Sequence, residues 1–169
     1  MHKWLKNEKG LTLVEVTGVL VLSVIILGFL IYMLNYSNMS LKQVSAREQT
    51  LQQSRDIMSH VVKTVRKGYA PASLISSSSN LRLVSAGNDE VVDYIYNSAS
   101  KSLTVSYTPK DASGTFAASP SSSFTYADTV QAILFDVNDG RIEITLTMQL
   151  PNHLTKTTST VVYTTQRNS

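Results

Sequence analysis

The first part of the chain is dominated by one long apolar run. From Leu11 to Leu34, 18 of the 24 residues are apolar, and no charged side chain occurs between Glu15 and Lys42. This run is longer than the roughly 20 residues that a helix needs to cross a bilayer. The pattern predicts a transmembrane helix over residues 11–35.

A second apolar pattern, with the spacing of a helix, follows the first. Between residues 36 and 67, apolar side chains recur every seven positions with others beside them; they are Leu41, Val44, Leu51, Ile57, Met58, Val61, Val62 and Val65. Gly68 and Pro71 are typical of a helix end. The helix is therefore predicted to continue as an amphipathic segment to about Lys67, with a stripe wide enough to pack on a sheet from Leu51 onward.

Beyond a serine-rich linker, Ser76–Ser79, apolar and polar residues alternate, as is typical of half-buried strands. The clearest alternation covers residues 103–108 and 141–150. Asn138, Asp139 and Gly140 tolerate the positive φ of a tight turn, so residues 133–137 and the segment after Gly140 are predicted to form a hairpin. Weaker strand patterns occur at residues 81–84, 91–96 and 160–164.

These patterns together define a fold class. Residues 109–123 are rich in Ser, Ala and Pro and are predicted to form a surface loop. The chain is predicted to be α+β, with one long N-terminal helix whose outer half packs on an antiparallel sheet of about four to six strands. The β-rich domain is expected over residues 68–169.

Composition and charge narrow the classes of function. The chain of 169 residues contains no cysteine, which excludes disulfides, cysteine metal sites and thiol catalysis. The net charge of +3 is unevenly distributed: residues 1–10 carry +2, residues 36–67 carry +4 and residues 68–169 carry −2. Direct nucleic-acid binding is not expected, because it would need a basic surface on the distal domain.

The basic residues at the start of the chain predict its orientation in a membrane. Lys3, Lys6 and Lys9 precede the apolar run, which favours a cytoplasmic N-terminus and an extracytoplasmic domain. A secretory signal peptide is not expected, because it would have a shorter apolar core followed by a small-residue cleavage site. An ordinary signal anchor fits the hydropathy equally well, and only Glu15 and residues 1–10 argue against it.

Glu15 is the one charged residue within the apolar run. A carboxylate in the membrane-spanning part of a helix costs about 2.5 to 3.5 kcal/mol on insertion scales, so such a residue usually has a function. Glu15 is therefore the first candidate for a functional side chain.

The segment Lys9-Gly10-Leu11-Thr12-Leu13-Val14-Glu15-Val16 resembles the start of type IV prepilins and of the pseudopilins of type II secretion and competence systems. Those proteins share a short basic leader that ends in Gly, then usually Phe, then Thr-Leu-x-Glu. Here Leu11 replaces Phe. The resemblance implies that residues 1–10 are a leader, which a prepilin peptidase removes between Gly10 and Leu11. It also implies N-methylation at Leu11 and a role for Glu15 in assembly.

The resemblance also implies a set of partners. They are the prepilin peptidase, other pilin or pseudopilin subunits, the bilayer and, indirectly, the assembly platform and its ATPase. The segments 51–55 and 65–69, with Gln166-Arg167-Asn168 near the end, look like those of J-type and PilW-like minor subunits. Major pilins often have a kinking proline in the anchor helix and a distal disulfide; this chain has neither, which favours a minor subunit.

Other polar residues give weaker signals. His2, His60 and His153 show no triad or metal-ligand spacing and are interpreted as surface or packing residues. The segment 136–140 is one residue short of the spacing of a calcium loop and is already explained as a hairpin turn. The basic residues of the amphipathic segment, Arg47, Arg55, Lys63, Arg66 and Lys67, are interpreted as a solvated helix face, with contacts to headgroups or a partner subunit as the alternative.

The sequence therefore supports one leading hypothesis and two alternatives. The leading hypothesis is a minor pilin or pseudopilin without enzymatic activity, cofactor, metal or catalytic residue. It would lie in the inner, or cytoplasmic, membrane as a single-pass protein and then in a cell-surface or periplasmic filament. The first alternative is a signal-anchored extracytoplasmic binding domain that does not polymerise. The second is a membrane-tethered enzyme, for which the sequence indicates no nucleophile or acid.

Overall fold

The computed structural model describes residues 13–72, 78–126 and 129–164. The chain divides into two compact units, Met1–Val44 and Ser45–Ser169. Gly10 and Leu11 lie outside the described residues, as do Ser76, Ser77 and the segment Gln166-Arg167-Asn168.

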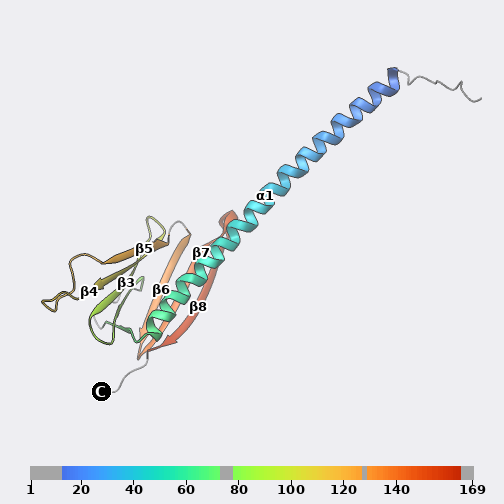
Figure 1. Ribbon diagram of the computed structural model, residues 1–169. Helices are drawn as coiled ribbons and strands as arrows, with labels where there is room; N and C mark the ends of the chain where they lie inside the picture. The colour runs from blue at the N-terminus through green and yellow to red at the C-terminus, as the bar shows by residue number, and fades with distance from the viewer. Residues whose placement is uncertain (1–12, 73–77, 127–128, 165–169) are drawn as a thin grey trace, which may run out of the picture. The chain divides into compact units, whose positions relative to one another are not determined.

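A single helix, α1, covers Leu13–Arg66 and is 54 residues long (Figure 1). It ends where the sequence predicts, because Gly68 adopts the left-handed conformation that closes many helices (φ 96°). Its N–H donates to the carbonyl of Val65 at 2.9 Å, and that of Lys67 donates to Lys63 at 3.0 Å. The prediction of one helix extending to about residue 67 is confirmed.

The helix has a buried face only in its last turns. Ile57, Met58, Val61 and Val65 are buried, whereas Val44 is 52% exposed. The structure thus confirms that the packing stripe lies toward the end of the helix. Polar residues share this face: Thr50, Ser54 and Thr64 are also buried. The hydroxyls of the two threonines donate to carbonyls one turn back, at 3.0 and 2.9 Å, which satisfies them within the helix.

The strands form two antiparallel sheets. The first has the order β1-β2-β3-β4-β5, and the second has the order β6-β7-β8. The prediction of a single sheet was wrong, because the alternation of residues indicates which face of a strand is buried but not which strands pair. Their bounds are Ala70–Pro71 (β1), Asn80–Val84 (β2), Glu90–Asn97 (β3), Ser102–Pro109 (β4), Ser122–Tyr126 (β5), Val130–Asn138 (β6), Arg141–Gln149 (β7) and Thr155–Tyr163 (β8). A short 3-10 helix, η1, covers Pro151–His153.

The clearest sequence patterns are strands in the structure. In β7 every second residue is buried, beginning at Ile142. Asn138 pairs with Arg141, and the two residues between them have positive φ, 46° at Asp139 and 74° at Gly140. These values match the two-residue turn that the twist of a hairpin favours. The predicted hairpin is confirmed.

The strands differ from the predictions at several points. Strand β6 begins at Val130 and not at Ile133, and β5 as a whole was not predicted. Ser122 and Ser123 belong to β5 and not to the predicted loop, because they pair with Tyr107 and Ser106 of β4. The short strand β1 was not predicted. The last strand begins at Thr155, earlier than expected. Pairing with β4 brings two serines, which are weak strand formers, into β5. Strand β8 is rich in Thr, Val and Tyr, so its earlier start agrees with its composition as well as with its pairing to β7.

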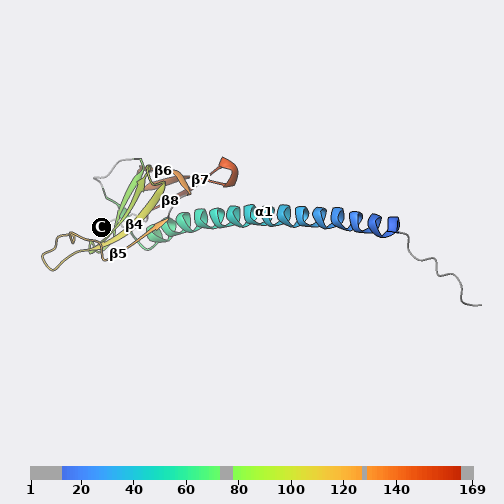
Figure 2. The same cartoon turned by 90° about the horizontal axis from the view of Figure 1, so that it is seen from above.

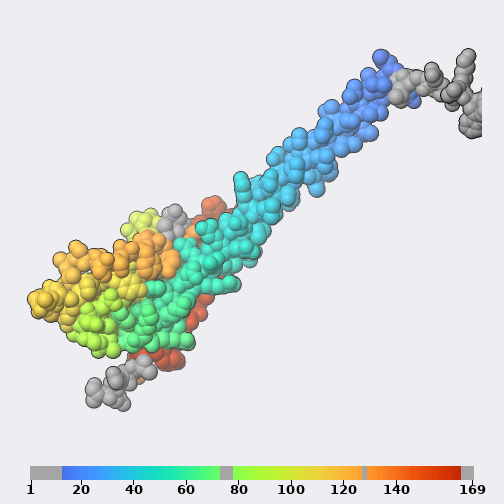
Figure 3. All heavy atoms as spheres, in the orientation of Figure 1, coloured from blue at the N-terminus to red at the C-terminus, as the bar shows by residue number. Residues whose placement is uncertain are grey.

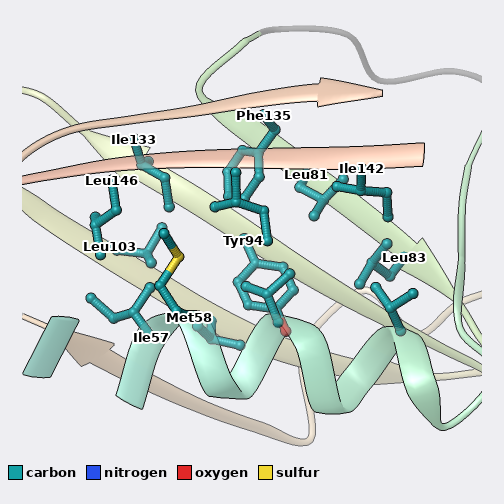
Figure 4. Close-up of a cluster of buried hydrophobic side chains, with 14 of the residues drawn as sticks. Ile57, Met58, Leu81, Leu83, Tyr94, Leu103, Ile133, Phe135, Ile142 and Leu146 are labelled. Atoms are coloured by element: carbon teal, nitrogen blue, oxygen red, sulfur yellow. The ribbon is translucent and has the colours of Figure 1, made fainter. Parts of the chain in front are cut away.

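One hydrophobic core lies within Ser45–Ser169, between the last turns of α1 and the two sheets (Figures 2 and 4). Ile57 and Met58 of α1 meet Tyr94 and Leu103 of the first sheet. The second sheet contributes buried residues from all three of its strands, which are Val130, Ile133, Phe135, Ile142, Ile144, Leu146, Met148 and Val162. The helix is therefore part of the same core as both sheets.

Candidate functional site

The first candidate site is the apolar part of α1. The described residues of α1 up to Gln49 are all exposed, and Figure 3 shows the surface of this segment in blue to turquoise. In the described part of the chain, α1 is the one helix long and apolar enough to cross a membrane. The length and composition of this segment are consistent with a transmembrane helix.

Glu15 lies in the first turn of this helix, with its side chain exposed. A carboxylate in the first turn interacts favourably with the helix dipole, whose positive end lies there. Glu15 is therefore compatible with the helix that contains it. Gly10 and Leu11, the other predicted site residues, lie outside the described residues, so the pairing of Leu11 with Glu15 stays a prediction.

Two hydroxyl groups of the apolar segment that contains Glu15 are satisfied within the helix. Thr17 Oγ1 donates to the carbonyls of Leu13 and Val14, each at 3.0 Å, and Ser23 Oγ donates to that of Val19 at 2.8 Å. Hydroxyls bonded in this way need no water, which suits an apolar environment. Glu15 thus stands out from its polar neighbours by its charge.

His60 is the centre of the second polar cluster, in the unit Ser45–Ser169. Its Nδ1 lies 2.8 Å from the Tyr94 hydroxyl, and its Nε2 lies 2.8 Å from the Tyr107 hydroxyl. Tyr94 donates to Thr64 Oγ1 at 3.0 Å, so its oxygen is left to accept a proton from Nδ1. Nε2 then accepts from Tyr107. Every proton of the cluster is used once when His60 is neutral.

The electrostatics of this cluster favour its neutral form. Burial lowers the pKa of His60 below 6.5, and the charges of Lys67 and Lys63 lower this pKa further. Burial raises the pKa of the Tyr94 hydroxyl. Tyr94 is buried on β3. Its hydrogen bonds to His60 and Thr64 therefore connect α1 to the first sheet. The structure places His60 on α1, half-buried and packed against Tyr94 of β3 and Tyr107 of β4.

The remaining sequence candidates do not come together. His2 lies outside the described residues, and His153 is exposed on η1. Asp139 and Gly140 form the hairpin turn. The basic residues of α1 and its C-terminal end are all exposed; they are Arg47, Arg55, Lys63, Arg66 and Lys67. Among the described residues, no group of three His, Asp or Glu could hold a metal ion.

An ion pair on the first sheet was missed by the sequence analysis. Arg82 of β2 and Asp93 of β3 are paired directly across the two strands. Arg82 occupies a polar position in an alternating segment, and Asp93 is the one charged residue within an otherwise apolar run, residues 91–96. Opposite charges in two neighbouring strands are the signal that could have identified the pair. The missing information was the register, because the two residues face each other only when Asn80 pairs with Ile95.

Comparisons of the chain with protein-family models, with curated proteins and with solved structures gave no match. The function is therefore argued from the N-terminal motif, the apolar helix and the distal domain.

Proposed function

We propose that this chain is the precursor of a minor pilin or pseudopilin, a subunit of a type IV pilus-like filament in a pilus, secretion or DNA-uptake system. The observation that carries the proposal is the segment from Gly10 to Glu15 at the start of a long apolar helix. The subunit would be inserted once in the cytoplasmic membrane, with residues 1–10 inside and the β-rich domain outside.

The chemistry of processing explains the spacing in this segment. Glycine before the cleaved bond lets the backbone enter a narrow protease site with no side chain in the way. Removal of residues 1–10 also removes Lys3, Lys6 and Lys9, whose charges hold the leader in the cytoplasm. Cleavage would thus free the helix to leave the bilayer and enter a filament.

Cleavage also creates an ammonium group at Leu11, which can pair with the Glu15 carboxylate of a neighbouring subunit. In an apolar environment an isolated charge is costly, so a subunit that fails to align these two groups is disfavoured. The exposed apolar side chains from Leu13 to Leu34 would pack against other subunits in the filament core. The charge pair would then set the axial position of each subunit.

The test of this proposal is leader cleavage by a co-expressed prepilin peptidase. The membrane-extracted protein should begin at Leu11, as measured by intact mass and N-terminal sequencing. Gly10→Leu should abolish cleavage without reducing insertion. Gly18→Leu is the matched control: it makes the same chemical change within the apolar helix, where a side chain meets no atom within 4 Å, and cleavage should be normal.

The result also separates the proposal from its alternative. A chain that keeps residues 1–10 in the presence of an active peptidase would be a signal-anchored domain and not a pilin. Cleavage of the Gly10→Leu variant at wild-type efficiency would show that the peptidase does not read this glycine.

A further inference from the structure

The outer face of the first sheet contains a recess of about 370 Å³. This face points away from the core, and the loop between β4 and β5, drawn in yellow and orange in Figure 1, closes one side of the recess. Its volume lies within the range of small-molecule sites, roughly 300 to 1,000 Å³. The residues that line it are Arg82, Val91, Asp93, Ser106, Thr108, Phe116, Ala117, Ala118 and Pro120.

The floor of the recess is polar but carries no net charge. Arg82 binds Asp93 through two nitrogens, with Nε 2.5 Å from Oδ1 and Nη2 2.7 Å from Oδ2. Asp93 is 9% exposed, whereas the Arg82 side chain is 41% exposed. Asp93 also pairs with Ser106 of β4. A guanidinium, a carboxylate and a hydroxyl thus lie in one row across three strands.

The loop that forms the wall is held in place by hydrogen bonds. The N–H of Ala117 donates to the carbonyl of Pro109 at 3.0 Å, and that of Ser121 donates to Tyr107 at 2.8 Å. At the tip, the Asp111 carboxylate accepts the N–H groups of Ser113 and Thr115. Hydrogen bonds from these two residues lower the pKa of Asp111 to about 2. The wall is therefore built by the chain's own contacts.

The polar floor and the apolar wall select the chemistry of a ligand. Asp93 would repel a free anion, and Arg82 would repel a free cation, so the ion pair disfavours charged ligands of either sign. A purely apolar ligand would bury the ion pair and the hydroxyls without replacing their bonds to water, which is costly. A ring with several hydroxyl groups provides donors and acceptors for the floor. Its C–H face can lie against the part of the Phe116 ring that Lys110 does not cover; Lys110 Nζ lies 5.4 Å from the ring centroid, and Phe116 is 39% exposed.

We propose that this recess binds an uncharged sugar ring. Neighbouring hydroxyls of the sugar accept a hydrogen bond from Arg82 and donate one to Asp93. Ser106 and Thr108 help to orient the ring, and Phe116 covers one of its faces. This binding site does not depend on the proposed role in a filament, because all of its residues belong to the distal unit.

The experiment uses the full chain in micelles of an amine-oxide detergent, because glucoside and maltoside detergents would compete. Methyl glycosides of glucose, galactose, mannose and N-acetylglucosamine are titrated one at a time by saturation-transfer difference NMR. Choline serves as a charged probe in the same experiment, and inorganic phosphate, which has no carbon-bound protons, is followed by the broadening of its 31P signal. The variants are Thr108→Val, which keeps the side-chain shape while removing a hydroxyl, and Phe116→Ala. Ile95→Ala is the control, because Ile95 is on the same strand face but does not line the recess.

At least one glycoside should bind the wild-type chain. Loss of one hydrogen bond should weaken its affinity about threefold to tenfold in Thr108→Val. A similar loss is expected in Phe116→Ala, and none in Ile95→Ala. The proposal is overturned if no glycoside binds, if only phosphate or choline binds, or if both recess variants keep wild-type affinity while their circular dichroism is unchanged.

Discussion

Replacing Tyr94 by phenylalanine is expected to destabilise the distal unit by about 1 to 3 kcal/mol. The substitution removes one oxygen atom from a side chain that is 1% exposed. That oxygen makes two hydrogen bonds, one with His60 Nδ1 at 2.8 Å and one with Thr64 Oγ1 at 3.0 Å. In Figure 4 it points from the first sheet toward α1.

The magnitude follows from the number of bonds that are lost. A hydrogen bond within a protein contributes about 0.5 to 1.5 kcal/mol net, so two such bonds give about 1 to 3 kcal/mol. The ring stays in place and leaves no large cavity, which removes the usual second cost of a core substitution. Thr64 keeps its own bond to the His60 carbonyl at 2.9 Å. His60 Nδ1 loses its acceptor and accounts for most of the expected effect.

Urea unfolding of a truncated chain that starts at Leu41, followed by circular dichroism, measures the effect. Tyr163→Phe is the matched control, because the same oxygen is removed from a side chain that is 71% exposed; its free energy of unfolding should stay within about 0.5 kcal/mol of wild type. Equal stability of Tyr94→Phe and wild type would refute the reasoning. It would mean that the cluster around His60 does not hold the helix against the sheet.

Three other changes probe different parts of the molecule. The truncated chain itself should be a folded α+β monomer by circular dichroism and sedimentation, because the exposed apolar residues before Leu41 are absent from it; a disordered product would contradict the assigned strands. Glu15→Val and Glu15→Gln should be inserted and cleaved normally but fail to crosslink to partner pilins, and normal crosslinking would contradict the proposed pairing with Leu11. The free energy of unfolding should decrease as pH falls through about 6.5, because the pKa of His60 is lower in the folded chain and the unfolded chain then binds more protons. This decrease should be smaller in His60→Gln.

The sequence was most informative where one face of an element is buried continuously. In β7 the alternation starting at Ile142 reports burial directly, because neighbouring side chains of a strand point to opposite faces. The helix end was predictable from Gly68, and the hairpin from Asp139 and Gly140, because these residues tolerate backbone conformations that others avoid. These are local properties of the chain.

Features that depend on pairing between distant residues were not predictable. Ser122 and Ser123 are weak strand formers, and they belong to β5 only because β4 offers a partner. The division into two sheets depends on which strands pair, and the Arg82–Asp93 contact depends on the pairing of β2 with β3. The alternation within a single strand does not name its partner strand. The predicted roles of Gly10, Leu11 and Glu15 rest on a local motif and on a resemblance, and they stay predictions.

The shared core has a consequence for the order in which the protein is made. Its first residue in the chain, Ile57, belongs to α1, and its last, Val162, belongs to β8. A ribosome therefore completes the helix long before it supplies the final strand, and the apolar face of the helix has no finished core to join during that interval. Until β8 is added, the neighbouring strand β7 also has an open edge, which is where strands of other chains can add. These surfaces therefore stay exposed until the last strand of the core is added.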